Sequence, residues 1–177
     1  FSHGQGHETS FAQVAAERLG LPLEKVRVVA GDTDAIPQGT GTYGSKSLQI
    51  GGTVAAKAAQ TVADRGKELA AELLEANPDD IVLDVDSGFH VVGAPSPSLT
   101  WSELTGRLVQ EGRLAELRAE ERFRAAAPTF PFGAHLAVVE VDTETGAVEI
   151  RQFVAVDDAG HIINPVVAEG QVHGGIA

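Results

Sequence analysis

The sequence predicts an α+β fold in which helices pack on antiparallel β-hairpins. Three patterns indicate this fold: a long helical pattern over residues 47–76, a short hairpin pattern over 81–92 and two alternating strands over 134–157. With 177 residues, of which 43% are hydrophobic, the chain is long enough to form a core. We expect a helix-rich lobe over residues 1–126, followed over 127–177 by a β-hairpin and the start of another helix.

The first half of the chain is predicted to hold two helices. The first covers about residues 8–19 and ends at Gly20, because glycine commonly follows a helix C-terminus. A run of β-branched residues over 26–30 then predicts a short strand. The second helix covers residues 47–76 and stops at Asn77-Pro78, since proline disfavours helical backbone at the residue before it.

Two hairpins are predicted in the rest of the chain. The first joins residues 81–83 to 89–92, and the second joins 134–142 to 147–157. In the last of these strands, apolar side chains alternate with charged ones, so we expect one apolar face and one polar face. The apolar positions are Val148, Ile150, Val154 and Val156, and the charged ones are Glu149 and Arg151.

Between the hairpins, residues 98–103 predict a helix start with Thr100 or Ser102 as its N-cap. A charged stretch follows over residues 113–124. We interpret it as a solvated helix face or a connector, because charge runs of this kind are usually in water.

The composition excludes several classes of function. A net charge of −12 argues against a nucleic-acid surface, which requires clustered Lys and Arg, and against an anionic membrane surface. No apolar run reaches the length of a membrane-spanning helix. The absence of cysteine excludes disulfides, thiolate metal sites and a cysteine nucleophile, and it fits a cytoplasmic location. The chain has no methionine and begins at Phe1, so we expect an excised piece of a longer polypeptide.

Residues 39–49 are rich in groups that bind anions. This stretch holds three glycines and four serine or threonine hydroxyls directly ahead of the long predicted helix. Glycine allows the backbone to approach a ligand closely, while hydroxyls and the free amides of a helix N-terminus complement phosphate oxygens. The stretch therefore predicts a phosphate-binding loop. The alternative is a flexible loop in which Ser47 only caps the helix.

This loop is close to a P-loop but departs from it. Ser45 stands between Gly44 and Lys46, whereas the P-loop requires its lysine directly after the glycine so that it reaches the outer phosphates. A nucleoside triphosphatase is therefore not predicted. Ser45 and Ser47 have no activating base nearby in sequence, so we interpret them as ligand-binding hydroxyls rather than nucleophiles.

A second glycine turn, residues 4–6, leads into the first predicted helix, and the two turns suggest two walls of one cleft. His3 and His7 are four residues apart, as in some metal sites. The intervening glycines break the helix that would point both rings one way. This favours histidines in a turn, which bond to neighbours or to a ligand.

Asp157-Asp158 could be an acid–base pair. Adjacent residues of a strand face opposite ways, however, which favours the interpretation that these carboxylates bond to amides of the following turn.

Taken in order, these motifs resemble the molybdopterin-binding large subunit of the xanthine dehydrogenase family, which includes aldehyde oxidoreductases and the large chain of aerobic carbon monoxide dehydrogenase. Each piece alone is weak, but the ordered set is specific. The motifs that carry the resemblance are residues 4–9, 31–34, 39–47, 156–160, 163–165 and 169–175. The Gly-Thr-Tyr-Gly-Ser version of the loop, residues 41–45, is most similar to the carbon monoxide dehydrogenase-like branch.

The resemblance implies a molybdenum-molybdopterin cofactor in its cytosine dinucleotide form. The metal is then held by the dithiolene of the pterin, so no protein metal ligand is expected. The cofactor contacts that the resemblance implies are Gln5, Gly6 and His7 at the pterin, Thr42, Gly44, Ser45 and Ser47 at the pyrophosphate and nucleotide, and Gln171 with Asp157 or Asp158 on the other side.

The activity that the resemblance implies is oxidative hydroxylation of an aldehyde, an N-heterocycle or carbon monoxide, with oxygen drawn from water. Its implied partners are iron–sulfur and FAD subunits or domains of the same enzyme. In the family, the general-base glutamate follows this segment and the substrate-facing loop precedes it, so we expect no catalytic residue here and no activity of the chain alone. The alternative is a non-catalytic acidic domain that binds a phosphorylated metabolite or nucleotide at the same loop.

Overall fold

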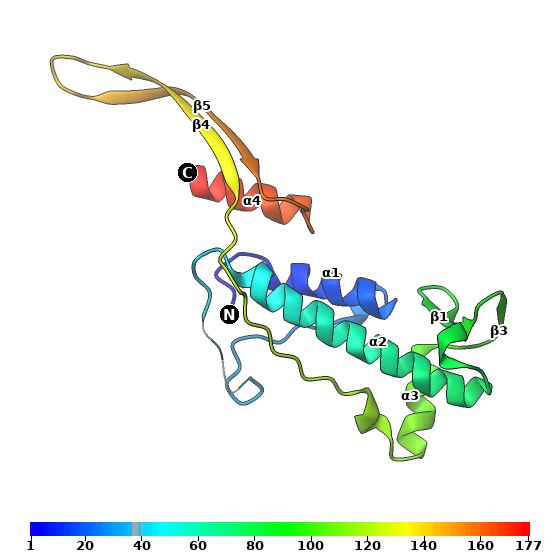
Figure 1. The fold of residues 1–177 in the computed structure, drawn as a ribbon. Helices are drawn as coiled ribbons and strands as arrows, with labels where there is room; N and C mark the ends of the chain where they lie inside the picture. Colours follow the sequence, from blue (N-terminus) through cyan, green and yellow to red (C-terminus); the bar gives the residue numbers. More distant parts are fainter. Residues whose placement is uncertain (37–38, 40) are drawn as a thin grey trace.

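The computed structural model describes residues 1–36, 39 and 41–177. The first part of the fold holds α1 (His7–Leu19), α2 (Thr53–Leu74), α3 (Trp101–Gln110) and an antiparallel sheet of β1 (Ile81–Asp84), β2 (Gly88–Val91) and β3 (Ala94–Leu99). The second part holds the hairpin of β4 (Phe132–Val141) and β5 (Val148–Asp158), followed by α4 (Pro165–Ile176). This arrangement confirms the predicted α+β fold (Figure 1). None of the helices in the described ranges has the length and hydropathy that a membrane crossing requires.

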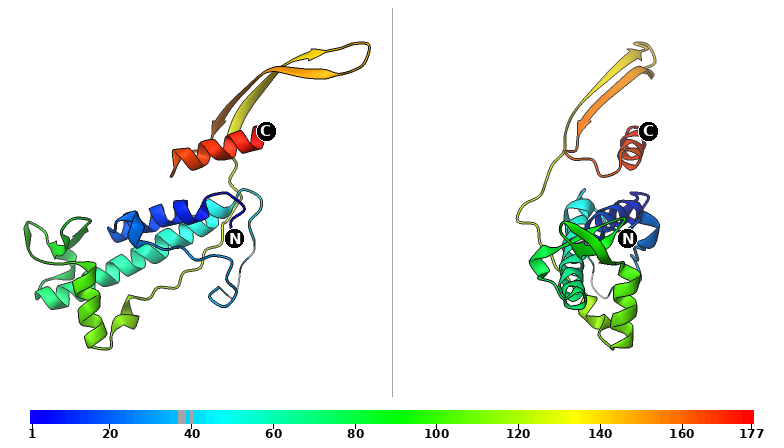
Figure 2. Two further views of the ribbon diagram at one scale, coloured as in Figure 1. Left: turned by 180° about the vertical axis from the view of Figure 1, so that it is seen from behind. Right: turned by 90° about the vertical axis from the view of Figure 1, so that its right-hand side faces the viewer.

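The two predicted helices of the first half are present and lie side by side (Figures 1 and 2). A short π-helical turn, Leu48–Gly52, precedes α2. Gly51 in this turn lies against α1, because a Cβ added there would be 2.8 Å from Cζ of Phe11. The glycine therefore allows the two helices to meet closely beside the loop of residues 39–49.

The core of the first part lies at the far end of α2, where the sheet and α3 cover it. Its buried side chains are Leu69, Ala70, Ala71, Ile81, Phe89, Leu104 and Leu108. Trp101 packs edge-on against Phe89, and its indole Nε1 donates a 2.7 Å hydrogen bond to the carbonyl of Leu19. This bond ties α3 to the end of α1, so α1 is joined to the element that packs on the far end of α2.

The helix after the sheet begins as predicted, with Thr100 as its N-cap in a capping box with Glu103. Residues 98–99, however, belong to β3, which the sequence analysis did not predict. This strand contains Pro95 and Pro97, which usually argue against a strand. Because β3 is the edge of the sheet, prolines are tolerated there.

The strand predicted over residues 26–30 is not formed. In the described part of the chain, these residues follow a 3-10 turn at Leu23–Lys25 and pair with no other strand. β-branched residues favour extended backbone, but a strand also requires a neighbour that offers free N–H and C=O groups. No such neighbour reaches this segment within the described residues.

The charged stretch is a connector, which was one of the two interpretations. After a short 3-10 turn, Leu114–Leu117, the chain extends along α2 toward the hairpin (Figure 1). We call residues 118–127 the strap. Its contacts with α2 and the preceding turn are Arg65 to the carbonyl of Arg118, Thr61 Oγ1 to Glu121 at 3.1 Å, Lys57 Nζ at 5.2 Å from the Phe123 ring, and Gln49 Nε2 to the carbonyl of Ala127 at 3.0 Å. Residues four apart share a helix face, so the strap follows one row of α2 side chains.

The long hairpin has the predicted strands but not the predicted faces. Val139 pairs with Ile150 and Val138 pairs with Gln152, so Arg151 is an unpaired bulge residue. Residues that pair across a ladder share a face. Val148 and Ile150 therefore lie on one face, with Val154 and Val156 on the other. The prediction of a single apolar face was wrong because strict alternation assumes a ladder without a bulge.

Candidate functional site

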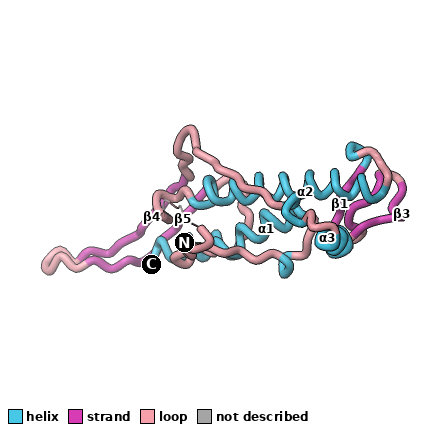
Figure 3. The backbone as a smooth tube through the Cα atoms, turned by 90° about the horizontal axis from the view of Figure 1, so that it is seen from below, coloured by secondary structure: helices cyan, strands magenta, loops and turns pink. Residues whose placement is uncertain are grey.

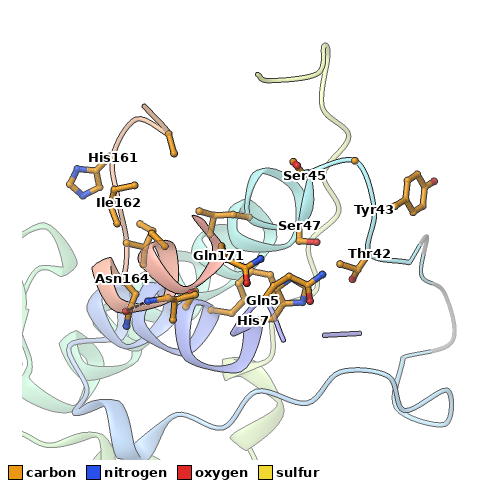
Figure 4. Close-up of a pocket in the computed structure, with 18 residues that line it drawn as sticks. Gln5, His7, Thr42, Tyr43, Ser45, Ser47, His161, Ile162, Asn164 and Gln171 are labelled. Atoms are coloured by element: carbon orange, nitrogen blue, oxygen red, sulfur yellow. Dashed lines mark hydrogen bonds between the residues drawn. The ribbon is translucent and has the colours of Figure 1, made fainter. Parts of the chain in front are cut away.

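A cavity of about 500 Å³ lies where the two parts of the fold meet (Figure 4). Its lining comes from three stretches that are distant in sequence: residues 5–11, 42–48 and 159–171. None of the described lining residues is an aspartate or glutamate, although the chain contains 25 of them. In a chain with a net charge of −12, a cavity without carboxylates is where an anion meets the least repulsion.

The first wall is the N-terminus of α1. Its N-cap is Gly6, with a φ of 65°, which supplies no side chain to cap the first N–H groups. His7 follows, is 7% exposed, and stacks on Phe11 with 5.2 Å between ring centroids. The Nε2 atom of His7 is buried and has no hydrogen-bond partner among the described residues. Burial lowers the pKa of His7 below its usual value, so the ring is neutral near pH 7.

The second wall is the loop that leads into α2. Gly44 and Ser45 both adopt left-handed backbone, with φ of 65° and 51°. This conformation is uncommon for serine and turns the loop sharply at the cavity. Thr42 donates its hydroxyl to the carbonyl of Phe1, and Lys46 lies over the Tyr43 ring at 3.6 Å from its centroid. The described loop thus connects to the start of the chain.

Ser47 distinguishes the two interpretations of this loop. It already has helical backbone, with φ −61° and ψ −44°, and its side chain makes no cap hydrogen bond. The alternative in which Ser47 only caps the helix is therefore not what the structure shows. Ser47 lines the cavity, and its side chain forms no hydrogen bond with another described residue.

The third wall is the segment that enters α4. Asn164 is the N-cap of α4, and its Oδ1 accepts a 3.0 Å hydrogen bond from the amide of Val167. The Nδ2 of the same residue donates to Oε1 of Gln13 on α1, at 2.9 Å. A Cβ added to Gly6 would lie 3.0 Å from Val167, so α4 rests against the first turn of α1. This contact between α4 and α1 places Gln171 at the cavity.

Of the nine residues predicted to contact a cofactor, seven line this cavity: Gln5, His7, Thr42, Gly44, Ser45, Ser47 and Gln171. Gly6 lies behind it, against Val167. Asp158 is also outside the lining, and its Oδ1 accepts a 2.8 Å hydrogen bond from the amide of Gly160. That bond agrees with the interpretation of Asp158 as a turn carboxylate. Whether these residues contact a cofactor stays a prediction.

Asp157 and His3 also lie outside the lining. Oδ1 of Asp157 is 3.1 Å from Nε2 of His135 on the neighbouring strand. His3 packs edge-on against the Phe1 ring, 4.4 Å between centroids, while His7 is buried against Phe11. The described residues contain no group of three or more His, Asp or Glu side chains arranged to hold a metal ion.

Several lining residues were not predicted, among them Ser10, Phe11, Tyr43, His161, Asn164 and Val167. Ser10 and Phe11 follow His7 by three and four residues, so the helical period could have placed them on the same face. The Asn164-Pro165 pair is a helix-start signal that could have placed a third helix N-terminus at the site. His161 carries no comparable signal.

A carboxylate-free cavity bounded by glycine-rich turns and helix N-termini has the chemistry of a domain that accommodates an anionic group. The family model of the molybdopterin cofactor-binding domain matches residues 1–177. The chain belongs to this family, which confirms the resemblance to molybdopterin-binding large subunits.

Known relatives agree with this assignment. The chain is 39% identical over 178 residues to the carbon monoxide dehydrogenase large chain of Hydrogenophaga pseudoflava, covering 99% of this chain and 22% of the relative. It is 35% identical over 181 residues to the nicotine 6-hydroxylase large subunit of Paenarthrobacter nicotinovorans, covering 99% and 22%. Among solved structures, quinoline 2-oxidoreductase from Pseudomonas putida 86 superposes with a TM-score of 0.85 at 38% identity, covering 100% of this chain and 23% of that one. The chain thus spans about a fifth of the length of the relatives it matches.

Proposed function

We propose that this chain forms part of the cofactor-binding site of a longer molybdenum hydroxylase, and that its cavity holds the pterin and phosphate groups of the cofactor. The observation that carries the proposal is that seven predicted contact residues, from three distant segments, line one cavity without carboxylates. The buried, unpartnered Nε2 of His7 is a second sign that a ligand atom belongs there. When bound, the molybdenum cofactor supplies the redox chemistry for hydroxylating a substrate with oxygen from water.

The residues of the chain bind and orient the cofactor in this proposal. The hydroxyls of Ser45 and Ser47, with the loop amides, donate hydrogen bonds to phosphate oxygens. The neutral ring of His7 and the uncapped amides of α1 meet the pterin end from one side. Gln171 meets it from α4, with an amide that both donates and accepts. Asn164 is a positioning residue, because it joins α4 to Gln13.

The finer features of the enzyme are part of the same proposal. The cofactor is proposed in its cytosine dinucleotide form, and release of cytidine phosphate from the purified enzyme would test this. Two relatives are named as a large chain and a large subunit, which supports an assembly with further subunits. Iron–sulfur and FAD partners, the class of substrate, a cytoplasmic location and inactivity of the chain alone stay predictions.

The second hypothesis was a non-catalytic domain that binds a phosphorylated metabolite at the same loop. The family match gives it no support. Metal analysis of the full-length protein separates the two hypotheses, because only a molybdenum hydroxylase purifies with stoichiometric molybdenum. A protein without molybdenum that retains a phosphorylated ligand would favour the second.

The sharpest test removes two hydroxyls from the loop. In the full-length protein, Ser45→Ala with Ser47→Ala is expected to weaken cofactor retention by about 3 kcal/mol, or more than about 100-fold, because two charge-assisted hydrogen bonds are lost. Molybdenum and nucleotide content after dialysis measure the effect. Ser98→Ala with Ser102→Ala is the matched control, since both serines lie outside the cavity. Full molybdenum content in the loop variant would defeat the assignment.

A further inference from the structure

The second part of the fold has no core of its own. None of the described residues from 127 to 177 is buried, whereas the first part has a closed core. The hairpin of β4 and β5 extends away from the helices (Figures 1 and 3). Its apolar side chains are largely in solvent: Phe132 is 77% exposed, Ile150 64% and Val156 67%. Exposed apolar surface gathered on one element in this way marks an interaction site.

The bulge at Arg151 divides this apolar surface between the two faces of the hairpin. On one face most of the large apolar residues lie in the outer half, near the turn: Val139, Val141, Val148 and Ile150. The same face carries Phe153 in its inner half, paired with Ala137. On the other face they lie in the inner half, near the connection to the strap and α4: Phe132, Leu136, Val138, Val154 and Val156. A cover on one side only would therefore leave half of the apolar surface in water.

Charged side chains on the strands of the hairpin form ion pairs with one another. Arg151 bonds to Glu140 at 2.6 Å and to Glu149 at 2.6 Å, so one guanidinium offsets part of the charge of the two carboxylates on the outer half of the second face. Strands that are rich in Val and Ile on both faces are typical of sheets buried on both sides. An isolated two-stranded hairpin is at best marginally stable in water. The surface thus fits apolar protein segments on both faces rather than an anion or a nucleic acid.

We propose that this hairpin is an internal element of a longer polypeptide, covered on its outer half by one segment of the same polypeptide and on the opposite face of its inner half by another. The proposal rests on the chain being part of a longer enzyme, but not on the assignment of the cofactor. The relatives contain enough further sequence to form such a cover, since this chain matches only 22% of their length. A second copy of the chain fits less well, because a two-fold interface uses one self-complementary patch and the apolar halves face opposite ways.

Thiol labelling of the full-length protein tests this surface. The variants are Ile150→Cys for one face, Val156→Cys for the other, and Glu144→Cys in the exposed turn as the matched control. The chain contains no native cysteine, and peptide-level mass spectrometry separates these sites from any thiol elsewhere in the polypeptide. We expect the sites at 150 and 156 to react with a water-soluble maleimide at least about 100-fold more slowly than the site at 144. This protection should persist on dilution and in the large polypeptide without other subunits.

Each other outcome overturns the proposal. Fast labelling at both face sites means that the hairpin is uncovered. Protection at only one of them means a one-sided partner. Protection that weakens on dilution indicates a second copy, and protection that requires other subunits indicates a separate partner chain. If the cysteine variants do not accumulate, amide hydrogen exchange over residues 132–158 of the unsubstituted protein decides the question, since rapid exchange contradicts burial. Molybdenum content is measured on the same samples, so failure of the cover is distinguished from failure of the cofactor proposal.

Discussion

His7 is the residue at which the site and the stability of the fold are most closely linked. It is 7% exposed, its ring stacks on Phe11, and its Nε2 has no hydrogen-bond partner among the described residues. Leaving a buried polar atom without a partner costs about 1–3 kcal/mol. A ligand that bonds to Nε2 recovers this cost. Cofactor binding at this position is therefore expected to stabilise the fold as well as complete the site.

The lowered pKa of His7 predicts how stability depends on pH. The unfolded chain titrates this ring near 6.5, and the folded apoprotein titrates it lower because burial disfavours the charged form. Between these two values the unfolded state binds more protons, so the free energy of unfolding falls as pH decreases from 7.5 through 6.5 toward the folded pKa. Urea unfolding of the apoprotein at pH 7.5 and 5.5 measures this loss. It should be smaller in His7→Phe and unchanged in the control His3→Phe.

Hydrogen bonds lower the folded pKa of some carboxylates, such as Asp84 and Asp142, so these groups lose their stabilising bonds only at more acidic pH. They are present in the wild type, in His7→Phe and in His3→Phe alike. The difference between wild type and His7→Phe therefore isolates His7. Equal losses in these two proteins would show that the ring is not neutral and desolvated in the folded state.

The sequence predicted cavity-lining residues where the signal is local, and it missed contacts between segments that are distant in sequence. Gly44, Ser45 and Ser47 were predicted from a run of glycines and hydroxyls before a helix, and all three line the cavity. Asn164-Pro165 is also a local helix-start signal, but the bond from Asn164 to Gln13, 151 residues away, could not be predicted from it. Asp158 was carried over from a motif, and its bond to the Gly160 amide shows how a turn can use such a residue instead.

At the scale of elements, the packing of α2 depends on glycine where the sheet and α3 meet it. A Cβ added to Gly66 would lie 2.7 Å from Cζ of Phe89 and 2.8 Å from Cη2 of Trp101. Phe89 is fully buried, and the indole of Trp101 is held by its bond to Leu19. Neither ring can move aside without disturbing the core.

This crossing predicts different effects for two helical glycines. Gly66→Ala is expected to destabilise the protein by up to about 2 kcal/mol, because overpacking costs about 1–3 kcal/mol and helix propensity returns roughly 1 kcal/mol. Gly106→Ala in α3 is the matched control: its added Cβ meets nothing within 4 Å, so the substitution should stabilise by up to about 1 kcal/mol. Thermal and urea unfolding of the two variants measure the difference. A Gly66→Ala protein as stable as Gly106→Ala would contradict the packing.

The elements that the sequence predicted well are those specified by local signals. The capping box of α3 and the periodicity of α2 act within one or two helical turns, so both helices were found. β3 and residues 26–30 were predicted incorrectly because pairing with a neighbouring strand decides them. The bulge at Arg151 is similar, since only the register of the two strands reveals it.

At the scale of the molecule, the cavity depends on how the two parts are joined. The strap follows α2 and ends at the bond between Gln49 and Ala127, next to the loop of residues 39–49. On the other side of the cavity, Asn164 and Val167 seat α4 on α1. Figure 2 shows α4 between the hairpin and the two helices. The site is therefore assembled from both parts, although only the first has a core.

This difference predicts unequal behaviour of the two parts when they are produced separately. Residues 1–126 contain all the buried side chains, so we expect helical circular dichroism, dispersed NMR signals and a cooperative thermal transition. Residues 127–177 have an exposed hairpin and an exposed helix, and we expect an unfolded spectrum because too little apolar surface is buried to offset the chain entropy. The full 177-residue chain should show the transition of the first part, with the hairpin ordered only weakly. A cooperatively folded 127–177 fragment would mean that the second part is stable without a cover, and that its apolar faces are closed by some contact other than the one proposed.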